Sequence, residues 1–416
     1  MSEDRATIQR RVLRVLVGGQ VVGAAALGAS VTVGAFVVQD ILGAETPFGG
    51  IASATVTMGT AFMSQVLARV MVRGGRRGGL QTGYVLAALG CVVAIVGVEL
   101  PSLPCFLSGL FLFGNGQASN LLARYAATDL AEPGERSQAM SRVVFASTFG
   151  AVFGPLFIAP AEWLGREWFG LETYSGPWLV SAVFLLMAAA NTFLRLRPDP
   201  LAVSGSAFVP RSRMKLSAAV RTVTATPRGR LALAAMVISQ STMVAVMTMT
   251  PVHMRLHGHE SMSPYVVSLH IAGMFAFSPL VGRYADRRGR TDAIFVGSLV
   301  LVLATVLSAM SGEDDLLLFP SLWLLGVGWN FGLIGGSSLL VESVDEPSRV
   351  RVQGAADLLM SFCGGVAGFT SGFIRRAVGF HVLSVSAMLL AGMLLVYSVR
   401  GSAGARTTWV SAFRRR

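Results

Sequence analysis

Twelve apolar stretches, each long enough to cross a membrane as a single helix, follow one another along this chain. A helix rises 1.5 Å per residue, so ~20 apolar residues are needed to cross ~30 Å of hydrocarbon. The pattern predicts an all-α membrane protein with twelve transmembrane helices. The stretches lie at Val15–Val38, Phe48–Ala68, Leu80–Val98, Leu103–Ala123, Val143–Ala161, Pro177–Leu194, Leu231–Val252, Ser263–Val281, Ala293–Ser311, Leu316–Val341, Val352–Ile374 and Val378–Val399.

The composition supports a membrane environment and argues against other classes of protein. Only 13% of the 416 residues are charged and 53% are hydrophobic, whereas a soluble domain carries about 25% charged residues. The net charge of +12 comes from short basic clusters between apolar stretches, not from one basic face, so we expect membrane lipid and no nucleic acid as a partner. Cys91, Cys105 and Cys363 all lie inside apolar stretches, which predicts packing residues and neither a disulfide nor a metal site.

A polar segment at 195–230 separates the first six stretches from the last six. It holds eight Lys or Arg residues and a single acid, Asp199. We therefore expect an N-terminal six-helix bundle at 1–194, a cytoplasmic linker at 195–230, and a C-terminal six-helix bundle with a cytoplasmic tail at 231–416.

The distribution of basic residues predicts the orientation in the cell membrane. Cytoplasmic loops are enriched in Lys and Arg. If the N-terminus lies in the cytoplasm, all Lys and Arg residues except Arg166, Arg255, Arg375 and Arg376 fall on the cytoplasmic side. Both termini are therefore predicted to be cytoplasmic.

The two halves repeat one another. Gly114-Asn-Gly116 in the fourth stretch corresponds to Gly326-Val-Gly328 in the tenth. After each comes a matching set at identical spacing: Arg136, Gln138, Arg142 and Gly150 in the first half, and Arg351, Gln353, Asp357 and Gly365 in the second. Parallel repeats of six helices are typical of transporters in which two bundles rock about a central site. The two bundles are thus expected to be pseudo-symmetric.

The loop after the eighth stretch carries a recognisable sequence motif. The segment after the eighth stretch matches the pattern GxxxDRxGR with Gly282, Asp286, Arg287, Gly289 and Arg290, and it resembles the signature of the major facilitator superfamily. The resemblance implies a gating role for this loop; a basic stop-transfer loop is the ordinary alternative.

The first-half copy of this loop is incomplete. It keeps Arg73, Gly75, Arg76 and Arg77, but Val72 replaces the aspartate and Ala68 replaces the first glycine. Because acids at the ends of the adjacent helices meet these arginines in this family, the resemblance pairs Asp129 with Arg76 or Arg77, and Glu342 with Arg290.

The fifth stretch contains Gly150, Gly154 and Pro155, which resemble the GxxxGP signature of exporters in this family. Small residues four apart also allow plain helix packing, and the proline favours a kink. The fourth stretch lacks the arginine that the family's antiporters carry after a glycine, since Leu110 follows Gly109. Arg124 is a candidate substitute, or a boundary arginine that reaches the lipid head groups.

Four ionisable residues are candidates for proton coupling: Asp357, His270, Arg142 and Arg124. An ionisable group inside a span is costly and suggests a function. The repeat predicts that Asp357 pairs with Arg142, either as a coupling pair or as a static structural pair. Histidine titrates near neutral pH, although His270 can equally be a neutral packing residue. Outer-loop histidines near His253 leave open either a metal site or an ordinary polar loop.

The expected function is proton-coupled export of small hydrophobic or amphipathic molecules by alternating access, without a cofactor and as a monomer. The alternatives are a proton-coupled uptake symporter of the same fold, or a membrane receptor or scaffold that transports nothing. No catalytic constellation occurs, so an enzyme is not expected. The predicted substrate cavity contains amides, thioethers and an indole from four helices: Gln20, Asn115, Gln117, Asn120, Gln240, Met243, Met247, Trp329 and Asn330.

Overall fold

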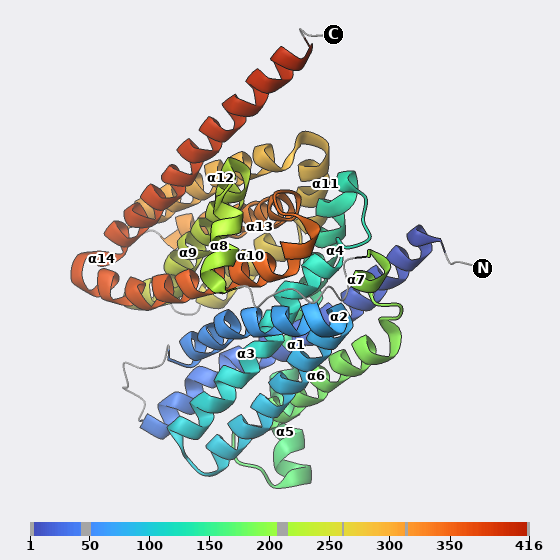
Figure 1. The fold of residues 1–416 in the computed structure, drawn as a ribbon. Helices are drawn as coiled ribbons and strands as arrows, with labels where there is room; N and C mark the ends of the chain where they lie inside the picture. The colour runs from blue at the N-terminus through green and yellow to red at the C-terminus, as the bar shows by residue number, and fades with distance from the viewer. Residues whose placement is uncertain (1–3, 43–50, 206–214, 260–261, 313–314, 414–416) are drawn as a thin grey trace. The chain divides into compact units, whose positions relative to one another are not determined.

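A computed structural model describes residues 4–42, 51–205, 215–259, 262–312 and 315–413 (Figure 1). Within these ranges the secondary structure is helical, with no strand. The α-helices are α1 (Arg5–Leu42), α2 (Ile51–Glu99), α3 (Leu103–Ala126), α4 (Arg136–Phe153), α5 (Ile158–Phe169), α6 (Ser175–Arg195), α7 (Pro200–Val203), α8 (Leu216–Thr224), α9 (Pro227–Leu256), α10 (Ser263–Phe275), α11 (Ser278–Arg288), α12 (Arg290–Met310), α13 (Leu318–Glu342) and α14 (Glu346–Phe413). Short 3-10 turns are η1 (Pro133–Glu135), η2 (Gly154–Phe157) and η4 (Asp315–Leu317).

The predicted apolar stretches fall on these helices and on the short turns beside them, except for residues 48–50, which lie outside the described residues. By length and composition, eight of the described helices can cross a membrane, or nine if the bent pair Pro133–Phe153 and Ile158–Phe169 is one span. Two of the eight contain two predicted stretches each, because α2 breaks at Gly75 (φ 76°) and α14 at Gly379 (φ 88°). The all-α fold is confirmed, and the helices are consistent with the twelve predicted spans.

The helices form two compact units. Unit 1 contains the described residues of 1–132, 142–214 and 353–362, and unit 2 those of 133–141, 215–352 and 363–416. Helices α4 and α14 therefore contribute a segment to both units. Residues 206–214 of the predicted linker lie outside the described residues.

Close backbone contact between α2 and α3 organises unit 1. A Cβ added at Gly114 would lie 2.6 Å from the backbone nitrogen of Thr60, so the two helices meet where neither has a side chain, as small residues allow in membranes. The buried Trp178 of α6 closes this core, with its ring edge-to-face against Phe106 and Phe113 at centroid distances of 5.6 and 5.4 Å.

Helix α13 is the centre of unit 2. It packs against α9, α10 and α12, and a Cβ added at Gly326 would lie 2.4 Å from the carbonyl oxygen of His270. Its residues are buried along most of the helix, including Leu322, Leu325 and Trp329. A helix that is apolar on all sides belongs in the interior of a bundle.

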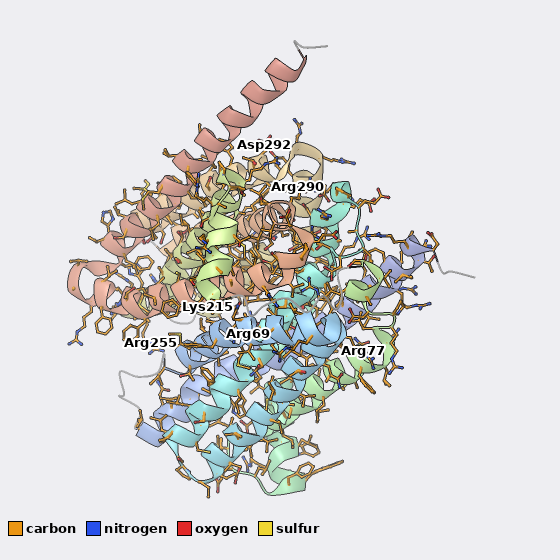
Figure 2. All side chains as sticks on the ribbon, in the orientation of Figure 1. Arg69, Arg77, Lys215, Arg255, Arg290 and Asp292 are labelled. Atoms are coloured by element: carbon orange, nitrogen blue, oxygen red, sulfur yellow. The ribbon has the colours of Figure 1, made fainter. Side chains whose placement is uncertain are left out.

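The outer surfaces of the helices are apolar. Large side chains such as Phe62 and Leu186 in unit 1, and Leu299 and Leu389 in unit 2, are 49–61% exposed. The side chains drawn along the helices are mostly carbon (Figure 2). Such extensive exposed apolar surface is costly in water but suits hydrocarbon, so these faces are fitted to lipid.

Candidate functional site

A buried ion pair between Arg124 and Asp357 lies inside unit 1. The guanidinium Nη2 of Arg124 is 2.5 Å from Oδ1 of Asp357, and Nη1 donates to Oδ2 at 3.4 Å. The side chains are 1% and 0% exposed. The Tyr125 hydroxyl, which accepts from Arg124 at 3.2 Å, lies 3.5 Å from the same carboxylate. Removing one charge from such a pair would leave the other buried without compensation.

Local sequence explains how the two charges meet. Arg124 lies in the last turn of α3 and also donates to the carbonyl of Leu121, where the negative end of the helix dipole favours a cation. Asp357 lies on α14 close to Gly354, at which an added Cβ would be 2.4 Å from the Cβ of Ala68. The glycine missing from α2 at position 68 is thus matched by a glycine on the facing helix, and close approach is kept.

The structure corrects the predicted partner of Asp357. Arg142 is exposed on α4 and has no ion pair among the described residues, whereas Arg124 carries the pairing. Equal offsets in two repeats place two side chains at similar depths, but they do not determine which neighbouring helix each side chain faces. Arg124, considered above as a boundary arginine, is instead fully buried.

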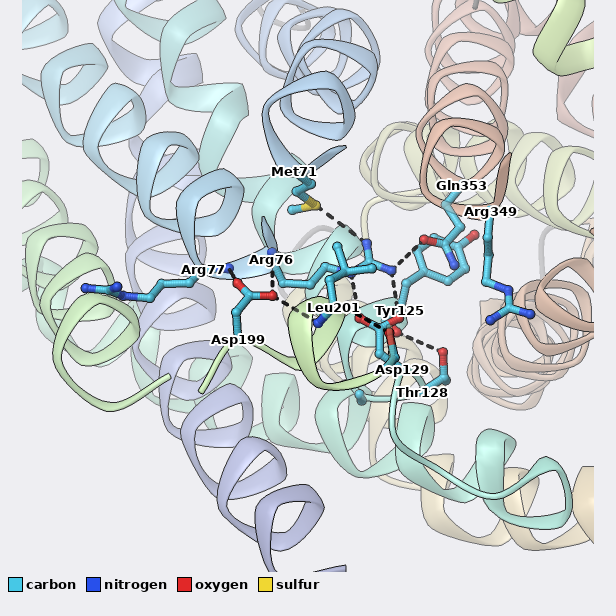
Figure 3. Close-up of polar contacts among 12 residues, drawn as sticks. Met71, Arg76, Arg77, Tyr125, Thr128, Asp129, Asp199, Leu201, Arg349 and Gln353 are labelled. Atoms are coloured by element: carbon cyan, nitrogen blue, oxygen red, sulfur yellow. Dashed lines mark hydrogen bonds and ion pairs between the residues drawn. The ribbon is translucent and has the colours of Figure 1, made fainter. Parts of the chain in front are cut away.

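A second buried cation joins the same face of α14. Arg76 donates from Nε and Nη2 to the two carboxylate oxygens of Asp129, at 2.8 and 3.0 Å. Its Nη2 also donates to Oε1 of Gln353 at 2.8 Å (Figure 3). Arg76 and Asp129 are 0% and 4% exposed. The predicted pairing of Asp129 with Arg76 is confirmed.

Gln353 and Asp357 connect the two pairs. They are four residues apart on one helix, so they lie on the same face one turn from each other. The result is a continuous buried polar face within unit 1, with Asp129 and Arg76 at one end and Arg124 at the other. Neither Gln353 nor Tyr125 was predicted to have a role in the site, although Gln353 is the repeat partner of Gln138.

The loop motif of unit 2 forms its own network. Asp286 accepts hydrogen bonds from the backbone amides of Ser137 and Gln138 at 3.1 and 2.8 Å, at the start of α4. Arg290 lies 3.0 Å from both Asp286 and Glu342 and also donates to the Pro133 carbonyl. The predicted pair of Glu342 with Arg290 is confirmed.

The incomplete loop of unit 1 is bound by a carboxylate from outside the motif. Asp199, from the segment after α6, accepts from the backbone amides of Arg76 and Arg77 at 3.2 and 2.8 Å (Figure 3). In the sequence, Asp199 stands out only as the single acid of the predicted linker. Its distance of more than a hundred residues along the chain gave no signal of this contact.

Comparison with known proteins then identifies the family. The model described as "Major Facilitator Superfamily" matches residues 19–369. The chain belongs to the Major Facilitator Superfamily.

Relatives and solved structures agree with this assignment over nearly the whole chain. The "Uncharacterized MFS-type transporter YdeG" of Bacillus subtilis (strain 168) is 36% identical over 94% of this chain and 92% of its own. The "Riboflavin transporter RfnT" of Brucella anthropi is 27% identical over 96% of this chain and 98% of its own. The structure of the human organic anion transporter MFSD10 has a similar fold, with a TM-score of 0.75 at 16% identity over 94% of this chain and 99% of that one.

This superfamily member is therefore an integral membrane protein that transports small molecules, and it is not an enzyme. Its fifth-span motif shows both features expected from sequence. A Cβ added at Gly150 would be 2.4 Å from the Cβ of Ala24 on α1, so this glycine serves helix packing. Gly154 and Pro155 begin the 3-10 turn η2, where α4 and α5 bend by 60°.

His253 and His270 of unit 2 both form hydrogen bonds with backbone carbonyls. His270 is fully buried, and its Nδ1 must donate to the Leu322 carbonyl at 2.8 Å because a carbonyl only accepts. At the end of α9, His253 donates from Nε2 to the Gly312 carbonyl at 3.0 Å, and its ring lies 4.3 Å from that of Phe380. In the described residues no three His, Cys, Asp or Glu side chains come together as metal ligands.

Most of the predicted cavity residues make contacts within their own unit. In unit 1, Gln20 donates to Ser147 at 2.8 Å, Asn120 accepts from Tyr84 at 2.9 Å, and Asn115 is fully buried. In unit 2, Trp329 donates to Gln240 at 2.6 Å and Asn330 accepts from Ser278 at 3.2 Å. The side chains of Gln117, Gln240 and Met247 are half-buried, and that of Met243 is buried.

Proposed function

We propose that this superfamily member exports small hydrophobic or amphipathic molecules in exchange for protons. The observation that carries the proposal is the buried Arg124–Asp357 pair. A carboxylate that meets a single guanidinium inside a bundle can take up a proton only by giving up most of its attraction to that cation. Protonation of Asp357 would therefore free Arg124 and change the packing of α3 against α14, which links proton binding to conformation.

The direction of transport rests on two supporting features. The fifth-span motif with its 60° bend resembles exporters, and the predicted cavity side chains are amides, thioethers and an indole, without a carboxylate. Thioethers and aromatic rings adapt to ligands of varied shape. The similarity to a riboflavin transporter makes a planar amphipathic molecule a suitable first probe. Proton-coupled uptake is the second candidate, since that name gives no direction.

The proposal includes the topology expected from sequence. The bundles 1–194 and 231–416 would alternate access to the substrate across the cell membrane, with the linker 195–230 and both termini in the cytoplasm and the chain acting as a monomer. The Asp286 and Arg290 loop would stabilise one state of this cycle, because its carboxylate binds the free amides at the start of α4.

Transport in proteoliposomes under an imposed pH gradient tests the exchange. An antiporter accumulates its substrate in acid-inside vesicles as protons leave, and a symporter does so in alkaline-inside vesicles, whichever way the protein is inserted. We expect riboflavin or a permanently charged lipophilic cation from a compound panel to accumulate in acid-inside vesicles. Protein-free liposomes are the control. Accumulation only in alkaline-inside vesicles would establish the uptake alternative, and flux unaffected by the gradient would refute proton coupling.

Asp286→Asn is expected to slow transport without weakening substrate binding. The carboxylate makes two amide hydrogen bonds and faces a helix N-terminus, which together are worth about 1–2 kcal/mol in one state of the cycle. That corresponds to a rate about 5- to 30-fold lower. The transport rate and equilibrium binding of the same probe would be measured, with the exposed Asp345→Asn as the control. Loss of binding with an intact rate would move Asp286 from the gate to the substrate site.

A further inference from the structure

The turn in α2 lacks the carboxylate that its counterpart in unit 2 possesses. At the second loop, Asp286 stands three residues before Gly289 and binds two successive amides. At the first loop, Val72 stands three residues before Gly75. The helix breaks at Gly75, so the amides of Arg76 and Arg77 begin a new helical segment without partners from the preceding turn.

Asp199 provides a carboxylate for these two amides from the linker. Its two oxygens bind the amides of Arg76 and Arg77 at 3.2 and 2.8 Å, much as Asp286 binds its two amides at 3.1 and 2.8 Å. Asp199 also caps α7 by accepting from the Leu201 amide at 2.9 Å. A carboxylate at a helix N-terminus is stabilised by the amides and by the helix dipole.

The linker segment that carries Asp199 is firmly anchored to unit 1. Leu196 and Leu201, on either side of it, are 0% and 5% exposed. Arg77 donates from Nε to the Phe193 carbonyl at 3.0 Å and lies over the Phe193 ring at 4.6 Å. The turn is built around the carboxylate, because a Cβ added at Gly75 would lie 2.3 Å from Oδ2 of Asp199.

We propose that Asp199 is a positioning residue that acts through Arg76. Asp199 accepts a hydrogen bond from the backbone amide of Arg76, and the guanidinium of Arg76 binds Asp129 and Gln353 (Figure 3). A displacement of this turn therefore moves the guanidinium away from the buried polar face. The linker is thus a working part of the site in unit 1, in addition to joining the two halves. This inference depends on neither export nor proton coupling.

Hydrogen–deuterium exchange of the full-length protein in lipid nanodiscs tests the contact itself. Asp199→Asn keeps the shape of the side chain but loses the charge, and Gly75→Ala displaces the carboxylate and also strains the backbone at this positive φ. Both should speed exchange at residues 76–79 by about tenfold, since the amides of Arg76 and Arg77 lose a charged acceptor and the first turn after Gly75 loosens with them. The controls are Gly78→Ala, where a Cβ meets nothing within 4 Å, and the exposed Asp4→Asn. Unchanged exchange at 76–79 in both test variants overturns the proposal.

Exchange at residues 127–131 separates positioning from simple helix capping. Arg76→Lys should loosen this segment, because Asp129 loses its two-point contact with the guanidinium. If Asp199 acts through Arg76, Asp199→Asn should speed exchange at 127–131 as well, and the double variant should match Arg76→Lys alone there. Faster exchange at 76–79 with no change at 127–131 would show that Asp199 only caps a helix, and would overturn the positioning role.

Discussion

Asp357→Asn should reduce gradient-driven transport by at least about 100-fold while the protein remains folded and inserted. Asparagine has nearly the shape of aspartate but cannot take up a proton or neutralise Arg124, so the step that links protonation to conformation is lost. If exchange for protons is obligatory, transport stops, because Arg124 cannot replace Asp357 as the group that takes up the proton. An effect of two decades corresponds to about 2.7 kcal/mol in the rate-limiting barrier.

The comparison variant for this test is Asp357→Glu, which keeps the charge and the titratable group at a shifted position. We expect partial transport from it and none from Asp357→Asn. Asp357→Asn leaves the Arg124 charge buried without a partner and should lower thermal stability, so transport is compared per amount of folded, inserted protein. Full gradient-driven accumulation by Asp357→Asn would remove Asp357 from the coupling mechanism.

Arg124→Leu is expected to destabilise the protein by about 3–5 kcal/mol, because it leaves the Asp357 charge buried without a partner. Replacing both residues by leucine removes both charges and should restore stability to within about 1 kcal/mol of the original chain, while transport remains absent. Thermal unfolding in nanodiscs measures both effects. Arg142→Leu is the matched control, and since Arg142 is exposed and has no ion pair among the described residues, it should change stability by only about 0.5 kcal/mol.

The double variant decides whether the pair matters as a pair. If the two leucine substitutions add instead of compensating, Arg124 and Asp357 do not stabilise each other, and the close approach of their side chains has no energetic consequence. Compensation without transport is the result that we predict. It would separate the stability of unit 1 from its function.

The fold was predictable because the bilayer imposes simple rules on sequence. Every backbone polar group in hydrocarbon must be satisfied internally, so apolar stretches of ~20 residues have to be helices. The breaks at Gly75 and Gly379 join pairs of predicted stretches into single long helices with a sharp turn. The sequence predicted a loop at Gly75 but placed Gly379 inside the stretch Val378–Val399, and the positive φ angles explain why glycine occupies both positions.

The ion pairs were predictable in part. Asp357 stood out because a carboxylate inside an apolar stretch is rare, and the pairs of Arg76 with Asp129 and Arg290 with Glu342 followed from the family resemblance. The prediction that Arg142 is the partner of Asp357 was wrong. The internal repeat relates these two residues by symmetry but does not determine which helices are in contact. The buried Arg124 on α3 lies 233 positions earlier in the chain.

The role of Asp199 could not be predicted, because it depends on tertiary packing and on the missing acid of the first loop. Val72 shows that the first loop lacks an acid, but the sequence does not indicate which other residue provides a carboxylate, or whether any residue does. Leu196 and Leu201 fix the linker segment to unit 1, and only that docking brings Asp199 to the two amides of α2. Polar groups recruited from distant segments leave no periodic pattern in the sequence.

Infrared difference spectroscopy can detect directly whether Asp357 takes up the coupling proton. Spectra of the protein in lipid would be recorded during acidification, for the original chain and for Asp357→Asn, and repeated in heavy water to identify exchangeable carboxyl bands. We predict a protonated-carboxyl band in the original chain that is missing from Asp357→Asn. The same band with equal intensity in both proteins would show that Asp357 is not the proton acceptor.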